Sequence, residues 1–369
     1  MPNDVSFETY CSSRGSFVTL GPFFHDFGVP FPIFKDLNLI DPTAIDAVTI
    51  DTLASAEIVQ FQRQYAPESL ITLRHLKSRN IPTIAHVDDN VWDIPPGNPA
   101  RTTYQGQILD RFFYIMHEAN AVTTSTVYLG KLCEKYNKNV HLFRNLVDLR
   151  MLDFKSSGRD NPEEIRIGWT TTPHHFDDWP TAQDAVGYIL STYPNAKMIF
   201  MGWLPPWCEK VPFTRFEFYD FVQVDSYYPC LANLDFDIGI APLEDNPFNK
   251  GKTARKAQEY AALEIPMILA HTSNYKEWVH GETCLKPQNN NAEGWVKALN
   301  QMIMHKSNRI ELAKRSRAQV TRNHDLMRYI WERSYVYYSV YRKVRGEAHP
   351  HEEYIINGMK ERNIPIREV

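Results

Sequence analysis

Residues 236–270 read "FDIGIAPLEDNPFNKGKTARKAQEYAALEIPMILA" and predict one complete unit of a parallel sheet. The two ends of this stretch are short apolar runs with the length and composition of buried strands. Between them, residues 252–263 have the spacing of a helix, with Ala254, Ala257 and Ala261 on one side. Small side chains on that side allow a helix to pack closely on a sheet. The strand–helix–strand order is typical of an α/β fold.

The same alternation of strands and helices extends over most of the chain. Strands are expected at 56–62, 81–87, 121–125, 139–143, 165–169, 196–202, 236–243 and 266–270. Helices are expected at 67–80, 103–118, 126–136, 178–192, 252–263, 292–304, 306–323 and 325–345. The first fifty-five residues, rich in Pro, Phe and Gly, do not read as regular structure.

A polar stretch at 151–164 divides this alternation into two arrays and reads as a linker. We therefore predict two Rossmann-like domains that face each other across a cleft, 1–150 and 151–323. Residues 324–369 are expected to form terminal helices and a tail that pack back on the first domain. In open parallel sheets, ligands bind beyond the carboxyl ends of the strands, so the cleft is the expected site.

Composition narrows the class of protein. The 369 residues are 43% hydrophobic and 13% aromatic, which favours packed cores over disorder. A net charge of −4 gives no global argument for nucleic-acid binding. Five scattered cysteines without paired spacing, no signal-like start and no long apolar run predict a soluble cytoplasmic protein. No His, Cys or Asp cluster has zinc-like spacing, so no metal site is predicted.

Four cations gather where the helix expected at 252–263 begins: Lys250, Lys252, Arg255 and Lys256. At 100° per residue, Lys252 and Lys256 share a side with Glu259, and Arg255 lies at its margin. Free N–H groups and added cations at a helix N-terminus make an anion site, such as a site for a diphosphate. Glu259, one turn further on, has the chemistry to accept hydrogen bonds from a ribose. The alternative is a solvated helix face with an Arg255–Glu259 pair at i,i+4 spacing.

The segment 241–270 resembles the donor-binding segment of two-domain (GT-B) glycosyltransferases of the large retaining family that uses sugar nucleotides. The phage- and bacteria-associated branch of that family shows the pattern P-L-x-D-x-x-F-N-x-x-K-[ST]-x-x-K-x-x-E-Y-A-A. The matching positions are Pro242, Leu243, Asp245, Phe248, Asn249, Lys252, Thr253, Lys256, Glu259 and Tyr260.

Three further segments are similar to the same branch. The stretch 165–179 resembles the segment that opens the second domain, through Trp169, His174 and Asp177. The stretch 86–100 resembles an acidic loop, through Asp88, Asp89 and Trp92, and 118–148 resembles the segment that closes the first domain.

The resemblance implies transfer of a hexosyl or pentosyl group from a nucleoside diphosphate sugar to an acceptor hydroxyl, with retention and without a bound metal or cofactor. Lys252 and Lys256 are then expected to stabilise the leaving diphosphate as catalytic residues. Asp88 and Asp89 follow a predicted strand, where one of them would position or deprotonate the acceptor hydroxyl. A helix cap or turn is the alternative for this pair. The expected donor-binding residues are Glu259, Arg255, Thr253, Asn249, Trp169, Thr171, His174 and Val222.

The chain departs from the family pattern in three places. The family carries two glutamates eight positions apart; Glu259 matches the second, and Gly251 stands where the first would be. Thr170, Thr171 and Thr172 replace a small Gly-Ser pair, which predicts a narrower donor pocket. The glycine-rich loop near the N-terminus is not evident, and "CSSRGSF" at 11–17 is a poor substitute for it.

The acceptor is left open between a glycan and a hydroxymethylated base in phage DNA. Residues 306–345 hold eleven Lys and Arg against three acids, a local net charge of +8, interleaved with tyrosines. Such a surface is able to follow a phosphate backbone, although tyrosines of a terminal helix also pack onto the first domain in this fold. Two other functions stay open: a sugar-nucleotide-binding module without catalysis, and a nucleic-acid-binding protein that uses the basic C-terminal helices.

Overall fold

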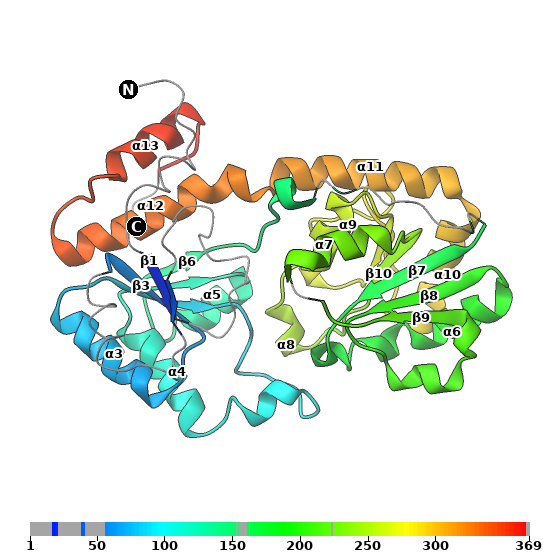
Figure 1. The fold of residues 1–369 in the computed structure, drawn as a ribbon, viewed down its shortest axis with the longest axis horizontal. Helices are drawn as coiled ribbons and strands as arrows, with labels where there is room; N and C mark the ends of the chain where they lie inside the picture. Colours follow the sequence, from blue (N-terminus) through cyan, green and yellow to red (C-terminus); the bar gives the residue numbers. More distant parts are fainter. Residues whose placement is uncertain are drawn as a thin grey trace.

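The computed structural model describes residues 17–20, 38–40, 56–152, 154, 161, 163–222 and 224–366. Figure 1 shows two lobes, each built around a sheet, with long helices running along one side of both. Every pair of neighbouring strands in both sheets is parallel. This arrangement is the expected α/β architecture of two Rossmann-like units.

The first sheet has the strand order β2-β1-β3-β4-β5-β6. Its strands are β1 (Phe17–Leu20), β2 (Asn38–Ile40), β3 (Ile58–Gln62), β4 (Thr83–Val87), β5 (Ala121–Thr124) and β6 (Val140–Leu142). The helices between them are α3 (Pro67–Ser78), α4 (Gln107–Glu118) and α5 (Val127–Cys133). All described side chains of β3, β4 and β5 are buried, as expected for central strands of a parallel sheet.

The second sheet has the strand order β11-β10-β7-β8-β9. Its strands are β7 (Ile165–Thr170), β8 (Ala196–Met201), β9 (Phe216–Tyr219), β10 (Ile238–Ala241) and β11 (Met267–Leu269). Its helices are α6 (Gln183–Thr192), α7 (Val224–Asn233), α8 (Pro247–Lys250), α9 (Arg255–Ala262) and α10 (Ala292–Met304).

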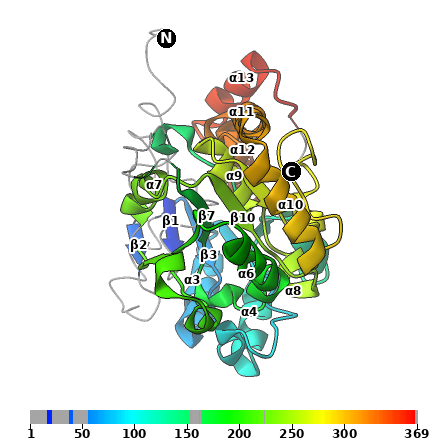
Figure 2. The same ribbon diagram turned by 90° about the vertical axis from the view of Figure 1, so that its right-hand side faces the viewer.

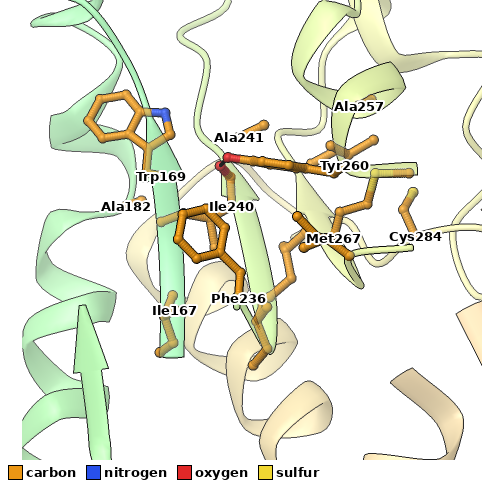
Figure 3. Packing of buried hydrophobic residues seen from close by; sticks show 14 of the residues in the cluster. Ile167, Trp169, Ala182, Phe236, Ile240, Ala241, Ala257, Tyr260, Met267 and Cys284 are labelled. Carbon is orange, nitrogen blue, oxygen red and sulfur yellow. Dashed lines mark hydrogen bonds between the residues drawn. The ribbon is translucent and has the colours of Figure 1, made fainter. Parts of the chain in front are cut away.

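The rings of Phe236 and Tyr260 lie against the strands in the core of the second sheet (Figure 3), and they pack closely on Gly168 and Gly239. A methyl group on Gly168 would lie 2.2 Å from the ring of Phe236. A methyl group on Gly239 would lie 2.8 Å from the ring of Tyr260. The absence of a side chain at these two strand positions therefore lets large rings cover β7 and β10.

The C-terminal helices connect the two lobes. Helix α11 (Lys306–Asn323) packs on α9, and α12 (Leu326–Arg345) continues onto the first sheet, followed by α13 (Glu352–Glu361). Figures 1 and 2 show α11 and α12 on the same side of the molecule. The chain passes between the lobes twice, near Val147 and again between α11 and α12, and the two crossings lie side by side. Val147 N donates to His324 O at 3.0 Å, and Leu326 N donates to Val147 O at 2.8 Å.

Four of the five tyrosines of α12 lie in the core. Tyr335, Tyr337, Tyr338 and Tyr341 pack with strand residues of the first sheet in one buried cluster, whereas Tyr329 is half-buried. These four rings are therefore not available to a ligand on the surface.

Several elements differ from the sequence prediction. Strand β9 and helix α7 were not expected, and the tail after α12 contains α13. Strands β1 and β2 fall within the region that was predicted to lack regular structure. Residues 11–16, where a glycine-rich loop was sought, and most of the predicted linker at 151–164 lie outside the described residues. In the part of the chain that the structure describes, no helix is both long and apolar enough to cross a membrane.

Replacement of Tyr337 by Phe tests the contribution of α12 to the first sheet. Tyr337 and Gln60 are fully buried, and Tyr337 Oη donates to Gln60 Oε1 at 2.6 Å. Loss of the hydroxyl leaves the buried amide without this donor, so we expect Tyr337→Phe to lower the free energy of unfolding by about 1–3 kcal/mol. Urea unfolding measures this change. The control Tyr188→Phe alters an exposed tyrosine of α6 and is expected to change stability by less than about 0.5 kcal/mol.

Candidate functional site

The loops at the carboxyl ends of the two sheets touch each other across the cleft. Phe248 of α8 is buried in the hydrophobic cluster of the first lobe. Asn90 Nδ2 donates to Pro247 O at 2.8 Å, and Asn98 Nδ2 donates to His174 O at 3.3 Å. Thr126 Oγ1 donates to Gly251 O at 3.3 Å. The loops after β4, β5, β7 and β10 therefore form one continuous site.

Lys252 lies in a non-helical link between two helices, not on the helix expected at 252–263. Helix α8 ends at Lys250 and α9 begins at Arg255, so that part of the prediction is wrong. The sequence explains this break, because Asn246 caps α8 by accepting from Asn249 N at 2.8 Å and Pro247 starts the helix. Asn274 Nδ2 fixes the link by donating to Asn249 O and Lys252 O at 2.6 and 2.8 Å.

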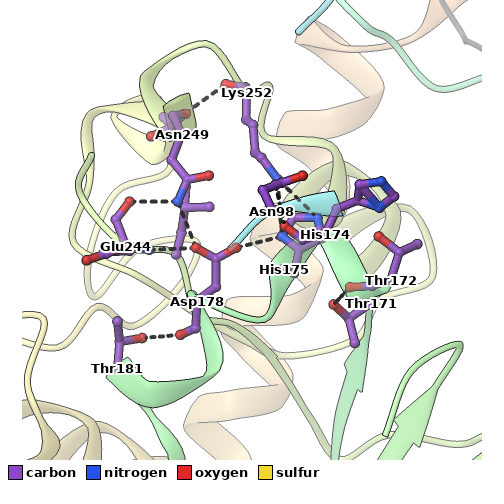
Figure 4. A network of polar contacts seen from close by, with 12 residues as sticks. Asn98, Thr171, Thr172, His174, His175, Asp178, Thr181, Glu244, Asn249 and Lys252 are labelled. Carbon is purple, nitrogen blue, oxygen red and sulfur yellow. Dashed lines mark hydrogen bonds and ion pairs between the residues drawn. The ribbon is translucent and has the colours of Figure 1, made fainter. Parts of the chain in front are cut away.

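A buried carboxylate, Asp178, organises the loops around Lys252 (Figure 4). Asp178 Oδ1 accepts from Asn249 Nδ2 at 2.7 Å and from Glu244 N at 2.9 Å. Asp178 Oδ2 lies 2.6 Å from His175 Nδ1. Burial raises the pKa of Asp178, but the hydrogen bond from His175, the charge of Lys252 and the Glu244 amide together hold that pKa below its usual value.

His175 is neutral at pH 7 and orients the ammonium group of Lys252. Burial, together with the charges of Lys252 and Lys256, lowers the pKa of His175 to about 3. Because the carboxylate of Asp178 only accepts, the proton lies on Nδ1 and the lone pair on Nε2. Lys252 Nζ lies 3.4 Å from both His175 Nδ1 and His175 Nε2, so the ammonium group contacts the imidazole ring.

Lys252 and Lys256 are half-buried cations that form no ion pair with a carboxylate among the described residues. Burial lowers the pKa of Lys252, and the charges of Asp178 and Asp89 oppose that shift. Burial and the charge of Lys252 lower the pKa of Lys256 to about 8. Two neighbouring ammonium groups at the carboxyl edge of a sheet, with no carboxylate bound to either, have the electrostatics of an anion site.

Arg255 and Glu259 hold each other inside the second lobe. Arg255 Nε donates to Glu259 Oε1 at 2.9 Å, and Arg255 Nη1 donates to Leu146 O at 2.5 Å. Tyr227 Oη donates to Glu259 Oε2 at 3.0 Å. The pair at i,i+4 spacing therefore forms, but it is buried and not solvated. Arg255 is a central member of this network and does not lie at the margin of the cation group, as the helical projection had placed it.

On the first lobe, Arg63 binds both candidate catalytic aspartates. Arg63 Nε lies 3.0 Å from Asp88 Oδ1, and Arg63 Nη1 lies 2.8 Å from Asp89 Oδ2. The side chain of Asp88 is buried, whereas that of Asp89 is 40% exposed, and the charge of Asp89 acts on Lys252. Asp89 is therefore the member of the pair that is open to the cleft.

Arg63 was not among the predicted site residues, although its position in the sequence is one signal for it. It is the first residue after the strand expected at 56–62, at the carboxyl edge where cleft residues lie. Its φ of 48° is in the left-handed region that residues other than glycine rarely adopt. Such backbone geometry is enriched at functional sites but is not visible in a sequence.

The histidine and aspartate that match the family motif are not the ones that bond to each other. The resemblance pointed to His174 and Asp177, but His175 and Asp178 form the hydrogen bond. His174 is exposed, and the charges of Lys252, Asp89 and Arg63 act on its ring, which places it at the mouth of the same cleft.

Four other predicted donor-binding residues make contacts within the protein. Thr253 Oγ1 accepts from Asn145 Nδ2 at 3.3 Å, and buried Thr171 donates to Thr172 O at 3.3 Å. Val222 is half-buried and packs on the core of the second lobe. Asn249 is buried and bonded to Asp178, so its amide holds the loop together.

Trp169 belongs to the core. Its side chain is 0% exposed and stacks on Trp179 with the ring centroids 5.1 Å apart. A side chain in this position does not reach a ligand in the cleft, so the prediction that it contacts a donor is wrong. In the described ranges there is no group of three or more His, Cys, Asp and Glu side chains that could hold a metal ion.

Gly251 lies at a close contact between the two lobes. A methyl group there would lie 2.9 Å from Asn90 Cβ and 3.1 Å from Leu129 Cδ2. In this arrangement of the lobes there is no space for the glutamate that the family carries at this position.

Comparisons with known proteins show the fold of this chain but not its function. No family model matches the sequence, and no curated protein matches it significantly. HepE of Anabaena, solved with UDP and glucose, is 10% identical, with a TM-score of 0.63 over 87% of this chain and 98% of that one. Sucrose-phosphate synthase from Thermosynechococcus elongatus is 11% identical, with a TM-score of 0.66 over 89% and 100%. A glycosyltransferase from Rickettsia africae is 11% identical, with a TM-score of 0.62 over 91% and 100%. The predicted fold class, two facing Rossmann-like domains of the GT-B type, is thereby confirmed.

Substitutions of Gly251 test whether the lobes close on this residue. We expect Gly251→Ala to lower the free energy of unfolding by about 1–3 kcal/mol, because the added methyl group overpacks the contact with Asn90. Gly251→Glu is expected to hold the lobes apart and to increase the radius of gyration measured by small-angle X-ray scattering. The control is Gly130→Ala on α5, where a methyl group meets only ordinary contacts at 3.6 Å. Unchanged stability and size in both Gly251 variants would contradict a closed contact here.

Proposed function

We propose that this protein is a glycosyltransferase that moves a hexosyl or pentosyl group from a nucleoside diphosphate sugar to an acceptor hydroxyl, with retention and without a metal. In this proposal, 1–150 is the acceptor-side domain, 151–323 binds the donor, and 324–369 packs back on the first domain. The carrying observation is the half-buried pair of Lys252 and Lys256, which no described carboxylate neutralises. The resemblance to the phage and bacterial branch of the retaining family supports the class of reaction.

Lys252 and Lys256 act on the leaving group. As the bond between the anomeric carbon and the diphosphate oxygen breaks, negative charge grows on that oxygen, and two fixed ammonium groups stabilise it. Neutral His175 contacts the ammonium group of Lys252 through its ring and adds no charge beside it. The folded protein already holds two like charges close together and partly away from water, so an anion that binds between them relieves their repulsion.

The remaining donor contacts follow from the geometry of the second lobe. Each carboxylate oxygen of Glu259 has one protein partner and a second lone pair, so it retains capacity to accept from ribose hydroxyls. Arg255 and Tyr227 hold that carboxylate in place. His174 at the mouth of the cleft, and the segment at Thr171 and Val222, complete the donor site in this proposal.

Asp89 binds the acceptor hydroxyl. It is the exposed member of the aspartate pair, and its charge acts on Lys252 across the cleft. As the acceptor oxygen forms its bond to the anomeric carbon, the hydroxyl proton passes to Asp89. Asp88, buried against Arg63, positions this loop and is not itself in contact with the substrate.

A nucleic-acid-binding function through the C-terminal helices has less support. Much of the +8 charge is used internally: Arg309 pairs with Asp237 at 2.8 Å, Arg342 pairs with Glu352 at 2.6 Å, and Arg333 is buried and donates to Arg144 O. A binding module without catalysis remains a separate candidate, because Gly251 takes the place of the first family glutamate.

A panel of nucleoside diphosphates and their sugars separates catalysis from binding alone. Isothermal titration calorimetry would measure affinity for UDP, GDP, ADP, CDP and dTDP, and UDP comes first because HepE was solved with it. Hydrolysis or transfer from the matching sugar nucleotide supports the enzyme. Tight binding without turnover on any acceptor supports the binding module, and no binding of any diphosphate contradicts both.

Removal of either buried lysine is expected to weaken binding of the diphosphate. Hydrogen bonds to charged groups contribute about 1.5–3 kcal/mol, so Lys252→Ala and Lys256→Ala should each lower affinity by about 10- to 100-fold and lower turnover at least as much. Lys250→Ala is the matched control, because Lys250 is exposed and lies 3.8 Å from Asp245. Near-normal affinity in both buried-lysine variants would rule out this anion site.

The pH dependence of diphosphate binding should follow Lys256. Its pKa of about 8 in the free protein rises when an anion binds, because the anion stabilises the charged form. Between these two values, affinity should fall by up to about tenfold per pH unit as pH rises. Calorimetry from pH 7.5 to 9.5, where the diphosphate is already ionised, measures the slope. Lys256→Arg keeps its charge throughout this range and should flatten the profile.

A further inference from the structure

An open groove runs along the cleft between the two lobes. Its volume is about 810 Å³, and both lobes line it. The first lobe contributes residues from the segments 91–96 and 101–109, and the second lobe contributes Asp177, Glu244, Asn246 and Pro247. A groove of this volume lies in the range of pockets that bind a substrate.

Two aromatic side chains in the groove wall are held in fixed orientations. Trp92 stacks on Phe113 with the ring centroids 5.5 Å apart, and Trp92 Nε1 donates to Tyr136 Oη at 3.4 Å. Tyr104 makes an edge contact with Tyr65 at 5.6 Å between centroids. Because these contacts lie on the protein side, the rings offer preformed apolar surface to a ligand.

The charge of the groove is negative, opposite to that of the lysine pair. Asp93, Asp177 and Glu244 line it, against one cation, Arg101, which donates to Ile94 O at 2.9 Å. Burial, then the charges of Glu244 and Asp178, raise the pKa of Asp177, as expected for carboxylates gathered at one place.

The groove begins close to Asp89 along the chain. Val91 and Trp92, two and three residues after Asp89, line it. Asn90 connects the parts, because its amide donates to Asp93 Oδ2 at 3.0 Å and to Pro247 O at 2.8 Å.

We propose that this groove binds the uncharged end of an oligosaccharide and presents one of its hydroxyls at Asp89. The inference deepens the proposed function and rests on it, because the oligosaccharide would be the glycosyl acceptor. Sugar hydroxyls donate to carboxylates, which only accept, and the apolar faces of sugar rings cover Trp92 and Tyr104. A phosphodiester or sulfated chain would meet three carboxylates and one cation, and its binding depends on Lys and Arg.

Binding of defined probes to the full-length protein tests the proposal. Saturation-transfer NMR, in the presence of UDP, would compare neutral malto-, cello- and chito-oligosaccharides with heparin fragments and with a DNA duplex that contains hydroxymethylated bases. We expect at least one neutral series to bind and the anionic probes not to compete. The proposal is overturned if only an anionic glycan or the DNA binds, or if no neutral series binds.

Groove variants assign the binding to these residues. Trp92→Phe keeps an aromatic ring in the cluster and should weaken neutral-glycan binding by about tenfold. Asp177→Lys should weaken it similarly and allow the anionic probes to bind. Asp184→Lys makes the same change at an exposed acid of α6 outside the groove and should have neither effect.

The affinity for UDP distinguishes this inference from the proposed function. None of the groove variants is expected to change UDP affinity by more than about twofold, because the lysine pair is intact. Loss of glycan binding with UDP affinity intact supports the groove assignment. Normal glycan binding in both Trp92→Phe and Asp177→Lys overturns the groove assignment and leaves the donor site standing, whereas failure of the wild-type protein to bind any diphosphate contradicts the proposed function itself.

Discussion

The buried carboxylate of Asp178 is the constraint on which the geometry of the cleft depends. It accepts from the loop after β10 through Asn249 and Glu244, and it fixes the ring of His175 in the loop after β7. A charge removed from water is tolerated only when hydrogen bonds satisfy it, so these two loops are locked to each other. Lys252 is placed by the same network, because Asn274 ties its backbone to that of Asn249 and its ammonium group contacts the ring of His175.

The sequence predicted the framework of the fold because its central strands are short, mostly apolar runs. Runs such as 81–87 and 236–243 are typical of strands in the middle of a parallel sheet, and β4 and β10 lie within them. Strand β9 was missed because it lies at the edge of its sheet, where Glu217 and Tyr219 face ion pairs and solvent and no apolar run is required. Helix α7 was missed as well, and it carries Pro229 in its interior.

The candidate site was harder to predict, because its geometry depends on contacts between distant segments. A helical projection placed Lys252 beside Glu259, but the cap at Asn246 starts a separate short helix and leaves Lys252 in a link. A motif match cannot show which of two adjacent histidines turns inward; here His175 does, because Asp178 lies beneath it. Trp169 matches the motif equally well, and its ring is one of the most buried in the core.

Charge divides the two sides of the cleft, and Asp89 lies on the boundary. On one side, the net charge around Lys252 and Lys256 is positive, because His175 is neutral and the carboxylate of Glu259 is paired with Arg255. On the other side, Asp93, Asp177 and Glu244 make the groove negative. An anionic ligand is therefore attracted to the lysine side and repelled by the groove, without any moving part. A glutamate at position 251 would place a negative charge next to the lysine pair, so the glycine preserves this separation of charge as well as the close contact with Asn90.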